Sequence, residues 1–186
     1  IRALITAQDL LVDLASYPSA LIAENSHRFR PLGLGYANLG ATLMALGLPY
    51  DSDAGRDWAA SVTALMTAEA YRVSAELAEK FGAFDGFTQN RDVMLGVIDQ
   101  HRNACEQLGS RNPISEAALD SWRRAQTAGM KHGYRNAQVT VLAPTGTIAF
   151  MMDCDTTGIE PDFALLKSKT LAGGGHLLIV NRSVTR

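Results

Sequence analysis

The residues best suited to bind a ligand form the short turn from Ala143 to Ile148, with sequence APTGTI. Gly146 lacks a Cβ atom, so a ligand could reach the main chain there, and Thr145 and Thr147 carry hydroxyl groups. A helix starting at this turn would add amide N–H groups without partners and the positive end of its dipole. An anion such as a phosphate group could therefore bind here without a lysine.

Two other interpretations of this turn are open. It could be a simple helix cap, with Thr147 as the N-cap residue, because strand-to-helix turns of this type are common. A phosphate loop of the Walker type is a weaker alternative, since it needs two glycines that bracket four residues and are followed by lysine. This turn has one glycine and no lysine.

The elements around the turn would position it. The apolar, β-branched run from Gln138 to Ala143 predicts a strand, and Ile148 to Asp153 predicts one or two turns of helix. A second structured loop follows at residues 155–161, and a glycine-rich turn at residues 171–175 precedes the apolar run Leu177 to Val180. Residues 180–186 are typical of a further strand.

The first 135 residues are mainly helical by pattern. In the longest segment, apolar residues recur every three or four positions and indicate a core-facing stripe; they are Trp58, Val62, Leu65, Met66, Ala70, Val73, Leu77 and Phe81. Ser19 and the pair Asn112-Pro113 are typical of helix starts. Helices are predicted over residues 1–16, 19–28, 37–46, 54–80, 91–108 and 114–130.

Three glycines at positions 33, 35 and 40 superficially match a dinucleotide-binding fingerprint. Their spacing is G-x-G-x-x-x-x-G, not G-x-G-x-x-G, and no clear strand of a βαβ unit precedes them. We therefore expect these glycines to allow close backbone packing at a helix start.

Composition points to an ordinary globular domain. The 186 residues are 47% hydrophobic, and 17 basic and 19 acidic side chains give a formal charge of −2. No basic run is present, so direct nucleic-acid binding is not expected. The sequence has neither an apolar stretch long enough to span a membrane nor a signal pattern, and we expect a cytoplasmic protein without a membrane partner.

The cysteines and the chain ends carry two further expectations. Cys105 and Cys154 lack the spacing of a metal site, so no metal site is predicted, and each is expected to be a small buried or half-buried side chain. Helical periodicity is already running at Ile1, which is not a methionine. We expect the chain to be a piece of a longer polypeptide.

Taken together, the motifs resemble the large catalytic subunit of ribonucleotide reductase, over nearly the whole chain and in the order of that family. The segments that carry this resemblance are residues 30–36 (RPLGLGY), 48–52 (LPYDS), 135–138 (RNAQ), 143–148 (APTGTI) and 158–161 (GIEP). Residues 151–162 (MMDCDTTGIEPD) and 171–175 (LAGGG) are most similar to the class II enzymes, which depend on adenosylcobalamin.

The resemblance implies a fold and a binding site. The fold would be α/β and helix-rich, part of a ten-stranded α/β barrel, with this chain in the C-terminal half of the catalytic domain. Residues 1–135 would be mainly helical, and residues 136–186 would supply strand, phosphate loop, short helix and further strand. The substrate phosphate-binding residues would be Ala143, Pro144, Thr145, Gly146, Thr147 and Ile148, with donors from the main chain at 146–148 and from both threonine hydroxyls. Asp155, Thr156 and Glu160 would order the neighbouring loop.

The resemblance also implies a reaction. Family members reduce ribonucleotides to 2′-deoxyribonucleotides through a thiyl radical that adenosylcobalamin generates. The resemblance implies a ribonucleoside diphosphate as substrate, a thioredoxin-type reductant and a homodimeric assembly. The Asn-x-Cys-x-Glu finger loop and the redox cysteine pair that this chemistry needs are not in the sequence. No catalytic role is assigned to Cys105 or Cys154, no cobalamin-binding residue is identified, and the piece alone is expected to be inactive.

Two alternatives remain open. The same chain could belong to a class I enzyme, which uses a dimetal-radical subunit, because some class I enzymes carry a nearly identical Pro-Thr-Gly-Thr loop. It could also be a non-catalytic, phosphate-binding helical module.

Overall fold

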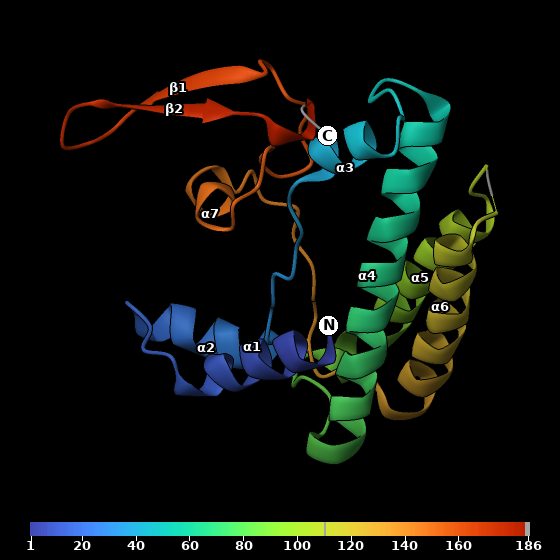
Figure 1. The fold of residues 1–186 in the computed structure, drawn as a ribbon. Coiled ribbons are helices and arrows are strands. Elements are labelled where there is room, and N and C mark those ends of the chain that lie inside the picture. Colours follow the sequence, from blue (N-terminus) through green and yellow to red (C-terminus); the bar gives the residue numbers. More distant parts are fainter. Residues whose placement is uncertain (110, 185–186) are drawn as a thin grey trace. The chain divides into compact units, whose positions relative to one another are not determined.

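The computed structural model describes residues 1–109 and 111–184 of the chain. Figure 1 shows its elements, which are helices except for one hairpin near the carboxyl end. They are α1 (Arg2–Leu14), α2 (Ala20–Phe29), α3 (Leu39–Ala45), α4 (Asp53–Phe81), α5 (Phe87–Glu106), α6 (Pro113–His132), α7 (Gly146–Met151), β1 (Leu166–Thr170), β2 (His176–Val180) and the 3₁₀ helix η1 (Arg182–Val184).

The chain divides into two compact units. The first contains Ile1–Leu34 and Asp57–Val141, and the second contains Gly35–Arg56 and Leu142–Arg186. Each unit is described by itself below. None of the helices in the described part of the chain combines the length and the apolar character needed to cross a bilayer.

The first unit has a core of helices and aromatic rings. The middle of α4 is buried on most sides, and the rings of Tyr71 and Tyr134 meet edge to face with centroids 5.5 Å apart. Tyr134 fits against α6 because residue 129 is glycine: a Cβ atom there would lie 2.1 Å from the Tyr134 hydroxyl oxygen. That hydroxyl donates to the Ala125 carbonyl oxygen at 3.0 Å, so the buried phenol is paired.

The predicted helices are confirmed with small shifts at their ends. Ser19 accepts a hydrogen bond from the Ile22 amide, and Asn112 forms a capping box with Ser115 at the start of α6. Helix α5 begins at Phe87, four residues before its predicted start, because the buried rings of Phe84 and Phe87 pack together there. The predicted stripe of α4 fails at its last member, Phe81, which is 65% exposed.

The strand predicted at residues 138–143 is present only as a short parallel pairing with residues 32–34. Leu32 N–H donates to Gln138 O at 2.8 Å, Leu34 N–H donates to Val139 O at 3.0 Å, and one β-bridge joins Leu34 to Thr140. The last bond of the pairing is donated by the Val141 N–H to the Leu34 carbonyl oxygen at 2.9 Å, and α7 begins five residues later. Gly33 permits this approach, as a Cβ atom there would lie 2.8 Å from Val141 Cγ1. The close backbone packing at a helix start that was predicted for the glycine-rich segment is found at Gly40 in α3, where a Cβ atom would lie 2.7 Å from the Glu160 carbonyl oxygen.

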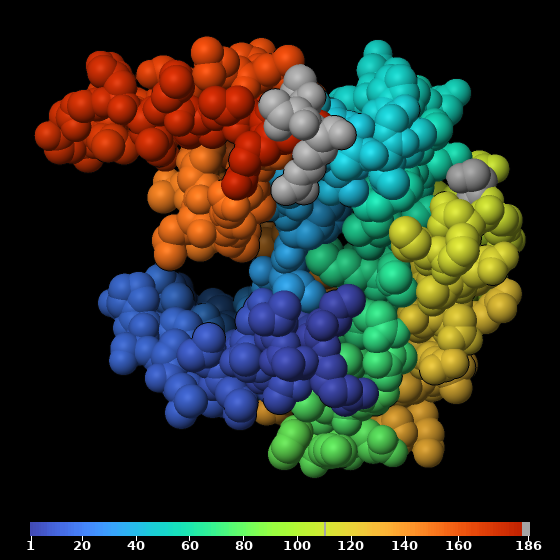
Figure 2. Space-filling view, viewed as in Figure 1, coloured from blue at the N-terminus to red at the C-terminus, as the bar shows by residue number. Residues whose placement is uncertain are grey.

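The second unit contains α3, α7 and the hairpin. Strands β1 and β2 pair antiparallel, with Leu166 opposite Val180 and Thr170 opposite His176. Figure 2 shows this hairpin standing out from the rest of its unit, and its apolar residues Leu166 and Leu178 are largely exposed. The apolar run predicted before residue 180 thus forms β2.

The further strand predicted over residues 180–186 is wrong for its described part. Residues 182–184 form η1 instead of continuing β2. The turn is fixed because the Ser183 N–H donates to Asn181 Oδ1 at 2.9 Å and to Asp155 Oδ2 at 3.1 Å. Residues 185–186 lie outside the described residues.

Candidate functional site

The turn predicted to bind phosphate lies at the surface of the second unit. Of its six residues, Ala143, Pro144, Gly146, Thr147 and Ile148 are exposed and Thr145 is half-buried. Helix α7 begins at Gly146, two residues before the predicted start. A Cβ atom added to Gly146 would meet no described heavy atom within 4 Å, so the main chain is open to a ligand at this point.

Amides without an acceptor inside α7 lie at the same place. The first hydrogen bond inside α7 runs from the Ala149 N–H to the Thr145 carbonyl oxygen at 2.8 Å. The N–H groups of Gly146, Thr147 and Ile148 precede it, so they have no acceptor within the helix. Thr145 precedes the helix but makes no side-chain capping bond to these amides. The alternative in which Thr147 caps the helix does not apply, because Thr147 lies inside α7.

Thr145 is held in an unusual conformation. Its backbone lies in the left-handed region, with φ 52° and ψ 32°, which a β-branched residue rarely adopts. Its hydroxyl oxygen accepts a hydrogen bond from the Gly158 N–H at 2.7 Å. The loop that follows α7 therefore reaches back to the turn that precedes it.

This second loop is fixed against α3. Thr156 is buried; its N–H donates to Asn38 Oδ1 at 3.0 Å, and its hydroxyl accepts from the Ala41 N–H at 3.1 Å. The chain passes close to Gly40, where a Cβ atom would lie 2.7 Å from the Glu160 carbonyl oxygen. The second loop thus connects α3 with the phosphate turn.

Acidic residues of the second loop bond to protein groups. Asp155 accepts hydrogen bonds from both the N–H and the hydroxyl of Ser183, and Glu160 accepts one from the Thr157 hydroxyl. Burial alone would raise the pKa of Asp155, but the hydrogen bonds from Ser183 and the charge of Arg182 outweigh it and lower the pKa. These contacts agree with the ordering role predicted for Asp155, Thr156 and Glu160.

Neither cysteine has the surroundings of a reactive thiolate. Cys105 is buried in α5, and burial raises the pKa of its thiol. Partial burial and the nearby carboxylates of Asp153 and Asp155 raise the pKa of Cys154 as well. Among the described residues, no group of three or more metal-ligating side chains is assembled.

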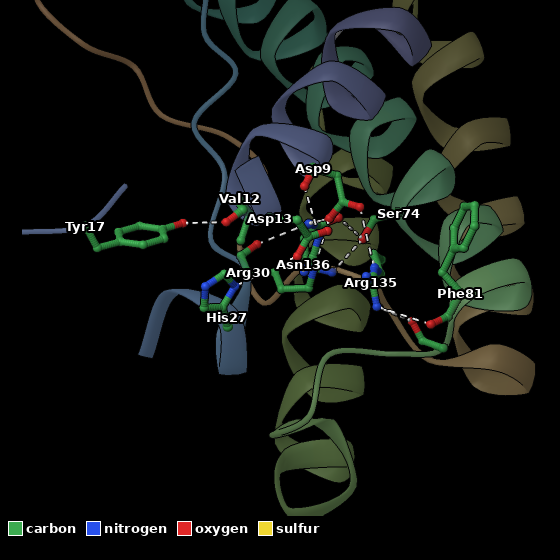
Figure 3. Close-up of polar contacts among 11 residues, drawn as sticks. Asp9, Val12, Asp13, Tyr17, His27, Arg30, Ser74, Phe81, Arg135 and Asn136 are labelled. Atoms are coloured by element: carbon green, nitrogen blue, oxygen red, sulfur yellow. Dashed lines mark hydrogen bonds and ion pairs between the residues drawn. The ribbon is translucent and has the colours of Figure 1, made fainter. Parts of the chain in front are cut away.

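A buried polar network in the first unit was not predicted (Figure 3). Arg30 donates through Nε to Asp9 Oδ1 at 2.9 Å, and its other nitrogens bond to Asp13 and to the Asp9 main chain. Asn136, which opens the segment leading to the phosphate turn, donates to Asp9 Oδ1 at 2.8 Å and accepts from the Ser74 hydroxyl at 2.9 Å. One signal was visible in the sequence, since Asp9 lies on the same face of α1 as the buried Ile5 and Val12.

The chain belongs to a known enzyme family. All of residues 1–186 match the family described as "Ribonucleotide reductase, barrel domain". Among individual proteins, the chain is 59% identical over 185 residues to a vitamin B12-dependent ribonucleotide reductase of Rhodopirellula baltica. The aligned region covers 98% of the chain and 18% of that protein. The chain is 50% identical to the protein of the same name from Agrobacterium fabrum, covering 95% of the chain and 15% of that protein.

A more distant relative bears a more specific name. The chain is 32% identical over 173 residues to a vitamin B12-dependent ribonucleoside-diphosphate reductase of Mycobacterium tuberculosis. The aligned region covers 93% of the chain and 20% of that protein. The chain therefore spans about a fifth or less of the length of these relatives.

Proposed function

We propose that this chain contributes the substrate phosphate-binding loop to an adenosylcobalamin-dependent ribonucleotide reductase, which reduces ribonucleotides to 2′-deoxyribonucleotides. The single observation that carries the assignment of the loop is the open main chain at Gly146, next to amides without acceptors inside α7. The family match and the names of the relatives support the reaction and the cofactor. We also propose that the chain is part of a ten-stranded α/β barrel, in the C-terminal half of the catalytic domain; the match to a barrel-domain family and the parallel pairing of residues 32–34 with the segment before the turn support a barrel.

In this proposal the residues of the chain bind and orient the substrate. The amides of Gly146, Thr147 and Ile148 donate to phosphate oxygens of a ribonucleoside diphosphate, with Ala143 and Pro144 forming the exposed approach to them. Fixing the diphosphate fixes where the ribose lies, which is the contribution of binding to catalysis.

Adenosylcobalamin, when bound, supplies the radical by homolysis. No radical role is assigned to Cys105 or Cys154, because neither lies in the Asn-x-Cys-x-Glu sequence that the resemblance implies for a thiyl-forming cysteine. No step through the cofactor is assigned to residues of this chain. A thioredoxin-type reductant, a homodimeric assembly and a cytoplasmic location complete the proposal, which includes no membrane partner and no direct contact with nucleic acid.

The loop is tested by Gly146→Val in the full-length protein. The added side chain would occupy the space that the phosphate needs, so we expect the Kd for cytidine 5′-diphosphate to rise at least tenfold, as a lost hydrogen bond to a charged group would cause. Gly96→Val is the matched control, because Gly96 also lies in a helix with no described atom within 4 Å of an added Cβ atom. Equal affinities in the two variants would refute the assignment.

The cofactor is tested separately. We expect the purified full-length protein to bind adenosylcobalamin, with the ultraviolet–visible spectrum of the cobalamin co-eluting with the protein on gel filtration. A protein that binds no cobalamin and requires a separate radical-generating subunit for activity would belong to class I instead.

A further inference from the structure

Gly158 and Thr145 form a contact that the proposed function does not yet use. They are thirteen residues apart, and the Gly158 N–H donates to the Thr145 hydroxyl oxygen at 2.7 Å. A hydroxyl group has one hydrogen to donate and two lone pairs that accept. Because one lone pair is taken by Gly158, the hydroxyl hydrogen remains for a different partner.

That hydrogen has no acceptor in the described part of the structure. Within residues 1–109 and 111–184, Thr145 takes part in side-chain hydrogen bonding only as the acceptor from Gly158. A hydroxyl that already accepts a hydrogen bond is polarised and becomes a better donor. The Thr145 side chain is therefore prepared to donate to an oxygen that has no hydrogen of its own, such as an ionised phosphate oxygen.

Residue 158 must be glycine for this contact to exist. Its φ is +48°, and a Cβ atom would lie 2.9 Å from the Ala143 carbonyl oxygen and 3.0 Å from that of Pro144. A side chain at this position would therefore collide with the backbone of the phosphate turn itself. The Gly158 carbonyl oxygen in turn accepts a hydrogen bond from the Leu39 N–H at the start of α3, at 3.5 Å, which fixes the peptide on its other side.

From this geometry we infer that Gly158 is a positioning residue for substrate binding: its N–H holds the Thr145 hydroxyl as a donor to a phosphate oxygen of the nucleotide. This inference rests on the proposed function. Gly158 itself does not touch the ligand and acts only through Thr145. A hydrogen bond from the hydroxyl is stronger to an ionised phosphate oxygen than to a neutral oxygen, so this donor favours phosphate.

Thr145 variants of the full-length protein test the donor. Thr145→Val keeps the shape of the side chain and removes the hydroxyl, so we expect the Kd for cytidine 5′-diphosphate to rise about tenfold or more. Thr145→Ser keeps a hydroxyl group, so its Kd for cytidine 5′-diphosphate should stay within about threefold of that of the parent protein. Equal losses in the two variants would overturn the inference, because the hydroxyl would then play no part.

Gly158→Ala tests whether the position of Gly158 acts on binding through Thr145. Its Cβ atom would collide with the carbonyl oxygens of Ala143 and Pro144 and so displace the N–H from the Thr145 hydroxyl, and we expect the Kd for cytidine 5′-diphosphate to rise at least as much as in Thr145→Val. In a Thr145→Val background the hydroxyl is already gone, so Gly158→Ala should raise the Kd by a smaller factor there than in the parent protein; an undiminished factor would overturn the inference. Gly47→Ala is the matched control, since Gly47 has φ +68° in the same unit but no described atom within 4 Å of an added Cβ atom.

The two proposals can fail separately. If Gly146→Val leaves binding unchanged, the phosphate loop itself is wrongly assigned. If Gly146→Val weakens binding while Thr145→Val does not, the loop stands and only the role of the hydroxyl is refuted. Should Gly158→Ala fail to fold, the comparison between Thr145→Val and Thr145→Ser still decides the inference.

Discussion

Replacing Asn136 by alanine is expected to loosen the segment that leads to the phosphate turn. The side chain is fully buried and makes three hydrogen bonds: its Nδ2 donates to Asp9 Oδ1 at 2.8 Å and to the Arg30 carbonyl oxygen at 3.1 Å, and its Oδ1 accepts from Ser74 Oγ at 2.9 Å. Alanine removes all three without giving the partners access to water.

The size of the destabilisation depends on which hydrogen bonds the partners of Asn136 keep in the variant. Asp9 Oδ1 still accepts from Arg30 Nε, and Ser74 Oγ still accepts from the main-chain N–H of residue 136 at 3.0 Å. A buried polar group left without a partner costs about 1–3 kcal/mol, and a lost bond to a charged group costs about as much. Two of the three partners keep another hydrogen bond. We therefore expect the free energy of local unfolding to fall by about 3–4 kcal/mol, which is less than the sum of three full penalties.

Hydrogen exchange measured by mass spectrometry on the full-length protein is the suitable assay, because it reports local opening. The amides of Leu34 and Val141, which pair the two segments, should exchange roughly a hundredfold faster in Asn136→Ala, the factor that corresponds to about 3 kcal/mol. Asn90→Ala is the control: Asn90 is exposed and makes one bond, from Nδ2 to the Gly86 carbonyl oxygen at 2.8 Å. Equal exchange in the two variants would refute the reasoning, since the network would then add no stability.

Two further variants test packing and charge. Gly129→Ala should lower the melting temperature of the full-length protein, because the 2.1 Å approach to the buried ring of Tyr134 forces overpacking of about 1–3 kcal/mol, whereas Gly96→Ala, with open space at its Cβ, should be neutral or stabilising. The hydrogen bond from Arg30 lowers the pKa of Asp13, so the carboxylate stabilises the fold above its unfolded pKa and this stability is lost as pH falls through the folded value. Melting temperatures measured from about pH 6 to pH 3 should therefore fall less in Asp13→Asn than in the parent protein, and parallel curves would contradict this.

The helices could be predicted from the sequence because their signals are local. Apolar periodicity and a capping side chain lie within a few residues of the element they define, as at Ser19 and Asn112. The strand at residues 138–143 was predicted from β-branched residues alone, and those residues do not specify a partner. Its pairing with residues 32–34, more than a hundred positions earlier in the chain, depends on tertiary structure that periodicity does not encode.

The buried network shows the same limit. An aspartate on the apolar face of α1 signals a buried charge, but its partners lie 21 positions away at Arg30 and 127 positions away at Asn136. Nothing local connects these residues. The start of α7 was misplaced by two residues for a related reason, because Gly158, in a different loop, holds the Thr145 hydroxyl and with it the residue before the helix.

The phosphate turn and the loop after α7 depend on each other. Thr145 and Gly158 both have left-handed backbones, with φ 52° and 48°, and for threonine this conformation costs about 1–3 kcal/mol. Their hydrogen bond joins the strained Thr145 to Gly158, a residue type that adopts this conformation readily, and the contacts of Thr156 with Asn38 and Ala41 fix the second loop to α3. A turn that presents main-chain amides needs such support, since amides orient a ligand only as well as their own backbone is oriented. This agrees with a motif of glycine, threonine and proline without lysine, in which main-chain amides and the Thr145 hydroxyl make the contacts.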